Sequence, residues 1–150
     1  FGVNTFTSSG KAVAPLCGIE AERILKDLGM EDQYRKYIAD AIRNHEAFKG
    51  TREAADKEGR LVSDALYDAD KFRWGPENFT TTLWTIVNAN DTPPESLYRV
   101  FKEKMKGIER IKETFRTRTG SQFGPEIIDQ GMTIGNAIYA EMSAMQKRGW

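Results

Sequence analysis

Apolar side chains recur every three or four residues along most of this chain, which is the period of an amphipathic helix. Segments that combine apolar and polar positions in this way are 19–28, 31–45, 60–70, 79–87, 94–117 and 125–145. Alternation of apolar and polar residues, the pattern of a strand, extends over no more than a few residues. The sequence therefore predicts an all-α fold, a single-domain bundle of about six helices spanning residues 1–150.

Glycine and proline mark the expected boundaries of these helices. Gly29 can take the left-handed conformation that commonly follows a helix, and Pro94 and Pro125 suit the first turn of later helices. Residues 119–121, Thr-Gly-Ser, are expected to end the helix that begins near Pro94. Residues 1–11 are rich in Gly, Ser, Thr and Asn, so they are expected to form a loop.

Composition narrows the class of protein. The chain has 22 basic and 22 acidic residues, so its formal net charge is +0 and no large field favours nucleic acid or an anionic membrane. We therefore expect no stable nucleic-acid partner. Because the chain has no apolar run of membrane-spanning length and no export signal, we also expect no membrane partner and a cytoplasmic location. The one cysteine, Cys17, cannot form an internal disulfide and is interpreted as a small buried hydrophobic residue.

The only histidine, His45, continues a helical stripe that includes Tyr34, Ile38 and Ile42. Its imidazole is therefore expected to face inward. A buried imidazole needs hydrogen-bond partners, because an unpaired one costs roughly 1–3 kcal/mol. Two explanations follow, a core histidine satisfied by its neighbours and a histidine that binds a metal or a substrate.

Asp70 extends the apolar stripe formed by Val62 and Leu66, whereas Asp68 points about 200° away around the same helix. An ionised carboxylate on an apolar stripe needs compensation, because burying it alone would protonate it instead. A divalent cation would provide that compensation. The alternatives are a surface position at a fraying helix end and an ion pair with a nearby Lys or Arg.

Two segments, 38–45 (Ile-Ala-Asp-Ala-Ile-Arg-Asn-His) and 66–71 (Leu-Tyr-Asp-Ala-Asp-Lys), resemble the second half of an HD-domain metal-dependent phosphohydrolase. The resemblance covers roughly residues 18–75. It implies an all-α domain whose metal is held by a His, a His-Asp dyad and a later Asp, with further histidines in two-metal members. The dyad and the upstream His are absent from this chain, and its first residue is Phe1. We therefore expect an N-terminally incomplete HD-like domain.

Carried over by this resemblance, Asp70 matches the final metal-binding Asp, and His45 matches a later His that binds a second metal or contacts the substrate phosphate. The resemblance makes both residues the predicted catalytic and metal-binding groups. Lys71 would neutralise a substrate phosphate, the alternative being a surface lysine at a helix end. Oxygen and imidazole ligands suit Mg²⁺, Mn²⁺ or Fe²⁺ and do not choose among them.

The implied function is metal-dependent hydrolysis of a phosphate ester, with a small phosphorylated molecule or a nucleotide as substrate, if sequence beyond this chain supplies the missing ligands. With His45 and Asp70 alone, the chain is expected to hold no tight divalent metal and to show little hydrolysis. The alternative is a non-catalytic all-α binding or scaffold domain without a metal. A homo-oligomer is left open, although the apolar stripe from Leu97 to Phe115 favours packing inside the domain over a dimer contact.

Overall fold

The structure, a computed structural model, describes residues 13–49, 54 and 56–149. Six α-helices and one short π-helix make up the ordered elements of this part of the chain, and none of its residues lies in a strand. The all-α prediction is confirmed. The loop predicted for residues 1–11 falls outside the described residues. Among the described helices, none combines the length and the apolarity that crossing a bilayer requires.

The described residues form two compact units. The N-terminal unit contains residues 13–70 together with 116–120. The C-terminal unit contains residues 71–115 together with 121–149. The histidine and the aspartate of the predicted site both belong to the N-terminal unit.

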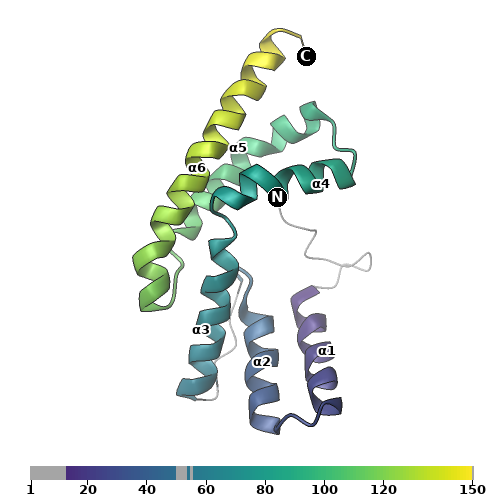
Figure 1. Ribbon diagram of the computed structural model, residues 1–150, viewed down its shortest axis with the longest axis vertical. Coiled ribbons are helices and arrows are strands. Elements are labelled where there is room, and N and C mark those ends of the chain that lie inside the picture. Colours follow the sequence, from purple (N-terminus) through teal and green to yellow (C-terminus); the bar gives the residue numbers. More distant parts are fainter. Residues whose placement is uncertain (1–12, 50–53, 55, 150) are drawn as a thin grey trace. The chain divides into compact units, whose positions relative to one another are not determined.

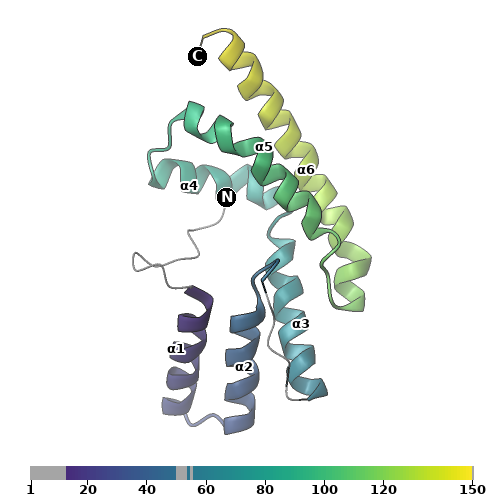
Figure 2. The ribbon, with the colours of Figure 1, turned by 180° about the vertical axis from the view of Figure 1, so that it is seen from behind.

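Three helices build the N-terminal unit, namely α1 (Val13–Asp27), α2 (Asp32–Asn44) and the part of α3 (Lys57–Phe72) that ends at Asp70. Figures 1 and 2 show α2 between α1 and α3. As predicted, Gly29 adopts a left-handed conformation after α1, with φ +78°. The amide of Met30 then donates to the carbonyl of Leu25 at 3.0 Å, which closes the end of the helix.

Small residues let α2 approach both of its neighbours. A Cβ atom on Gly18 of α1 would lie 2.8 Å from Cγ of Arg43, and a Cβ atom on Gly59 of α3 would lie 2.8 Å from the ring of Tyr37. Nearer its end, α2 contacts α3 again, because the side-chain amide of Asn44 donates to the hydroxyl of Ser63 at 3.3 Å. From the first contact with α3 to the second, the residue numbers rise on both helices, so α2 and α3 run parallel.

The N-terminal unit buries small and polar side chains and exposes large apolar ones. Its buried residues include Ala14, Tyr37, Ala39, Ala41, Asn44, Ser63, Tyr67 and Asp68. Its exposed residues include Leu16, Ile19, Ile24, Leu28, Leu61, Val62 and Leu66. Cys17 is also exposed, so the prediction that it is buried is wrong. The reason is that α1 meets α2 through Gly18, which turns the preceding side chain away from the contact.

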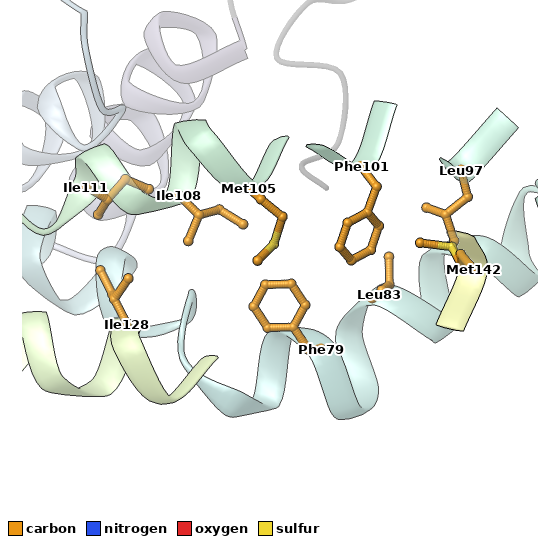
Figure 3. Close-up of a cluster of buried hydrophobic side chains, with 9 residues drawn as sticks. All are labelled: Phe79, Leu83, Leu97, Phe101, Met105, Ile108, Ile111, Ile128 and Met142. Carbon is orange, nitrogen blue, oxygen red and sulfur yellow. The ribbon is translucent and has the colours of Figure 1, made fainter. Parts of the chain in front are cut away.

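The C-terminal unit has an apolar core of the usual kind. It contains the π-helix η1 (Asn78–Thr82), α4 (Leu83–Ala89), α5 (Pro94–Ile111) and α6 (Arg118–Lys147) from residue 121 onward. Figure 3 shows the buried cluster, in which side chains of η1 and α4 meet those of α5 and α6. Its members are Phe79, Leu83, Leu97, Phe101, Met105, Ile108, Ile111, Ile128 and Met142.

Three boundaries predicted from the sequence are wrong, and the first is the start of α1, which lies at Val13 instead of near Ile19. Helix α5 ends at Ile111 instead of near Thr117, and residues 119–121 lie in the first turn of α6 instead of ending α5. Pro125 lies inside α6 and does not open it. The physical reason is a cap, because the hydroxyl of Thr117 accepts a hydrogen bond from the amide of Gly120 at 2.9 Å and starts the helix seven residues before the proline.

Candidate functional site

His45 lies at the C-terminal end of α2, where it is half-buried and forms the C-cap of the helix. Its Nδ1 lies 2.5 Å from the carbonyl oxygen of Ile42. A carbonyl only accepts, so Nδ1 carries the hydrogen, and the neutral ring then has its lone pair on Nε2. A histidine held in this way by a backbone carbonyl has the orientation that metal-binding histidines commonly have.

Asp70 lies in the last turn of α3 and is half-buried. The stripe that it was predicted to share with Val62 and Leu66 does not face the core, because both of those side chains are exposed. The buried positions of α3 follow a neighbouring stripe, one residue further along, made of Gly59, Ser63, Tyr67 and Lys71. The contact with α2 determines which stripe of α3 is buried. Gly59, at the start of the buried stripe, leaves room for the ring of Tyr37 of α2.

Asp68 is the deeply buried carboxylate of α3, with only 3% of its surface exposed. It accepts hydrogen bonds from the backbone amides of Arg116 at 2.9 Å and Thr117 at 2.8 Å, and from the hydroxyl of Thr117 at 2.6 Å. The guanidinium of Arg116 also stacks over the ring of Tyr67, 3.5 Å from its centroid. Asp68 therefore anchors the start of α6 within the N-terminal unit, a role that its local sequence pattern did not reveal.

The contact between α2 and α3 shows where His45 and Asp70 lie along the helix pair. His45 directly follows Asn44, which contacts Ser63 of α3. Asp70 lies seven residues after Ser63, so it points within about 20° of the direction of Ser63 and lies about 10 Å further along α3, past the end of α2. His45 lies one residue after Asn44, so its side chain points about 100° away from the direction of that contact.

Both residues also lie near helix C-termini, although α3 continues nine residues past Ser63, which meets the end of α2. The C-terminus of a helix carries a partial negative charge, which favours a cation nearby. The imidazole Nε2 and the carboxylate are donors that suit a divalent cation. Their number is small for a metal site, and no group of three or more His, Cys, Asp or Glu side chains among the described residues is placed to hold a metal ion.

Lys71, the residue predicted to contact a substrate phosphate, is almost fully buried, with 1% of its surface exposed. The alternative of a surface lysine at a helix end is therefore wrong. Lys71 is the first residue of the C-terminal unit, whereas His45 and Asp70 belong to the N-terminal unit. Its contact with a phosphate stays a prediction.

Comparisons with known proteins give no family for this chain. No protein-family model matches it, and neither the curated proteins nor the solved structures include a match. The resemblance to the HD-domain phosphohydrolases thus depends only on the two segments that contain His45 and Asp70.

Proposed function

We propose that the N-terminal unit contributes His45 and Asp70 to a divalent-metal site that hydrolyses a phosphate ester of a small molecule or a nucleotide. The observation that carries the proposal is that both donors lie near the C-terminal ends of two parallel helices of one unit, where the helix dipoles favour a cation. The donor types suit Mg²⁺, Mn²⁺ or Fe²⁺. When bound, such a cation polarises a phosphoryl oxygen and lowers the pKa of a bound water toward about 7.

The residues of this chain would hold and orient the site. The hydrogen bond from Nδ1 of His45 to Ile42 fixes the ring so that Nε2 is the ligating atom. The bond between Asn44 and Ser63 holds the end of α2, and with it the backbone of His45, against α3. Asp70 would supply negative charge to offset the cation. Two donors are fewer than such metals usually take from a protein and its waters, so further ligands have to come from outside the described residues.

The proposal can be tested through the imidazole of a single residue, because His45 is the only histidine of the chain. Its imidazole C–H protons give one set of resonances in a proton NMR spectrum. A paramagnetic ion bound through Nε2 broadens those resonances at substoichiometric concentration. We therefore expect Mn²⁺ to broaden the His45 signals in the wild-type chain and to broaden them much less in Asp70→Ala.

The matched control is Asp64→Ala, on the same helix. Asp64 lies six residues before Asp70, and its carboxylate is 3.7 Å from the guanidinium of Arg116, on a different side of α3. The Asp64→Ala chain should respond to Mn²⁺ as the wild type does. If Asp70→Ala leaves the Mn²⁺ response of His45 unchanged, the proposed pairing of these two ligands is wrong. Hydrolysis of bis(p-nitrophenyl) phosphate is expected to be weak for the chain by itself.

A second candidate function is a non-catalytic helical binding domain. It is favoured by a different observation, the exposure of Ile24, Leu28 and Leu66 in the N-terminal unit. Exposed apolar side chains gathered on one side of a protein mark interaction surfaces. Under this function His45 would be a capping residue and nothing more, and Mn²⁺ would leave its resonances sharp.

A further inference from the structure

Two tyrosines meet where α5 and α6 pack together in the C-terminal unit. The rings of Tyr98 on α5 and Tyr139 on α6 are stacked, with their centroids 5.2 Å apart and their planes 10° apart. The ring of Phe101, a member of the buried apolar cluster, stacks on the ring of Tyr139 at 6.1 Å. Because a fully buried side chain supports the stack, both tyrosine rings are fixed at the edge of the core.

Three hydroxyl groups gather at this place. The hydroxyl oxygens of Tyr98 and Ser143 lie 3.5 Å apart, close enough to share a long hydrogen bond, and Ser143 is one turn after Tyr139 on α6. The side chains of Tyr98, Tyr139 and Ser143 are all half-buried, so water reaches the hydroxyl groups only in part. A hydroxyl group can turn to donate to an acceptor that is placed beside it.

Two lysines continue the same helical stripes. Lys102 follows Tyr98 by four residues on α5, and Lys147 follows Ser143 by four residues on α6, so each lysine points to the same side of its helix as the hydroxyl group before it. Both lysines are exposed. Among the described residues, no carboxylate lies within ion-pair distance of either ammonium group, whereas Lys106 and Lys112 do have carboxylate partners.

The two lysines lie on either side of the hydroxyl groups. Between the contact of Tyr98 with Ser143 and the contact of Met105 with Gly135, the residue numbers rise on α5 and fall on α6, so the two helices are antiparallel. One turn after Tyr98 on α5 and one turn after Ser143 on α6 are therefore opposite directions along the contact. Lys102 and Lys147 consequently flank the Tyr98–Ser143 pair.

These surroundings favour negative charge at the hydroxyl oxygen of Tyr98. The pKa of Tyr98 is lowered from its usual value of 10.0, first by the hydrogen bonds with Ser143 and Tyr139 and then by the positive charges of Lys147 and Lys102. The pKa of Tyr139 is raised from the same usual value, because its hydroxyl group hydrogen-bonds to Tyr98. Donors and charges that stabilise a phenolate oxygen also stabilise the oxygen of an anion that is bound beside it.

We propose that Tyr98, Ser143, Lys102 and Lys147 bind the phosphate group of a small phosphate monoester. The two hydroxyl groups donate hydrogen bonds to phosphate oxygens, and the two ammonium groups offset the two negative charges. Because the lysines are exposed, the site is open to solvent and leaves room for the rest of the molecule. The site lies within the C-terminal unit and does not rest on the proposed function.

The test is a titration of the whole chain with glycerol 3-phosphate at constant ionic strength, followed through the ring protons of the tyrosines by NMR. Tyr98→Phe identifies the resonances of Tyr98. We expect the resonances of Tyr98 and Tyr139 in the wild type to shift and to reach saturation. Acetate, which has a single charge, should bind at least about 10-fold more weakly, because it loses one charge-assisted interaction.

Lys102→Ala and Lys147→Ala should each raise the dissociation constant of glycerol 3-phosphate about 10-fold, because each removes one of the two positive charges. The matched control is Lys104→Ala, since Lys104 is exposed on the same helix and points about 200° away from Lys102. It should bind as the wild type does. Glu95→Gln should bind more tightly, because it removes a negative charge one turn before Tyr98.

Tyrosine resonances that stay unmoved throughout the titration overturn the proposal. A response that Lys104→Ala weakens as much as Lys102→Ala and Lys147→Ala overturns it as well, since such a response is diffuse charge attraction without a site. Circular dichroism verifies that each variant keeps its helices. Asp70→Ala, the variant that tests the metal site, should bind glycerol 3-phosphate as the wild type does, so failure of one proposal is distinguished from failure of the other.

Discussion

The carboxylate of Asp68 accepts two hydrogen bonds from Thr117, one from its backbone amide at 2.8 Å and one from its hydroxyl at 2.6 Å. The two residues are 49 positions apart in the sequence. Through this pair a buried carboxylate near the end of α3 caps the start of α6. The same hydroxyl accepts the amide of Gly120, so the aspartate also orients the residue that begins the helix.

Asp68→Ala is therefore expected to be strongly destabilising. It leaves the buried amides of Arg116 and Thr117 without their acceptor, and an unsatisfied buried donor costs about 1–3 kcal/mol. We expect the free energy of unfolding to fall by about 3 kcal/mol, measured by urea denaturation. Asp64→Ala, one turn earlier and in a partly exposed ion pair, should cost no more than about 1 kcal/mol. Equal effects of the two substitutions would show that Asp68 is not the anchor.

The pair also shows why the sequence predicted the wrong carboxylate as the buried one. Helical period groups Val62, Leu66 and Asp70 on one stripe, but it does not say which stripe of a helix faces its neighbours. In α3 the buried stripe is decided by Tyr37, whose ring needs the space that Gly59 leaves. The partners of Asp68 come from a distant segment, and no local pattern contains that information.

The C-terminal unit was predicted better because its own large apolar residues form its core. The stripe of α5 that includes Leu97, Phe101 and Met105 is buried as expected. Helix α6 also packs closely at Gly131, against the backbone of Trp74 and Gly75, and at Gly135, against the side chain of Met105. For the candidate site, the sequence predicted an inward-facing His45 that needs hydrogen-bond partners, and the structure shows a half-buried ring bound to the carbonyl of Ile42. The role of His45 and that of Asp70 stay predictions.

The pH dependence of stability should reflect Asp56, which precedes α3. Its Oδ1 accepts the amide of Gly59 at 2.9 Å, and its Oδ2 accepts the hydroxyl of Tyr37. These bonds, the one from Gly59 first, hold the pKa of Asp56 below its usual value of 3.8. A carboxylate whose pKa is lower in the folded state stabilises the protein above its unfolded pKa, and that contribution is lost as pH falls through the folded value. The melting temperature should fall as the pH drops from about 5 to about 2, and we expect this fall to be smaller in Asp56→Asn.

Tyr37→Phe is the control for this pH effect. The hydrogen bond to Asp56 raises the pKa of Tyr37 above its usual value of 10.0. A group with a raised pKa stabilises the folded state below its unfolded pKa, and the contribution is lost as pH rises through the folded value. Tyr37→Phe should therefore make the fall in melting temperature at acid pH somewhat smaller. It should also reduce the fall in melting temperature above about pH 10. If the melting temperature of both variants falls at acid pH as steeply as that of the wild type, the Tyr37–Asp56 pair is not the source of that fall.

The thiol of Cys17 should react readily in the native protein, because Cys17 is exposed on α1. Ellman's reagent should modify this thiol at a rate close to that of the unfolded chain. Reaction that becomes fast only in denaturant would show that Cys17 is buried after all. Since Cys17 is the only cysteine, the colour change reports this position alone.

Two helical glycines of the C-terminal unit should respond to alanine in opposite ways. A Cβ atom on Gly131 of α6 would lie 2.6 Å from the carbonyl oxygen of Trp74, a backbone atom that cannot move aside easily. We expect Gly131→Ala to lower the free energy of unfolding by about 1–3 kcal/mol through overpacking. Gly107 of α5 has no atom within 4 Å of the same position, so Gly107→Ala gains helix propensity without a clash. It should raise the free energy of unfolding by about 0.5–1 kcal/mol, measured by urea denaturation beside Gly131→Ala. If both substitutions stabilise the protein, α6 does not approach the segment of Trp74 as closely as the structure places it.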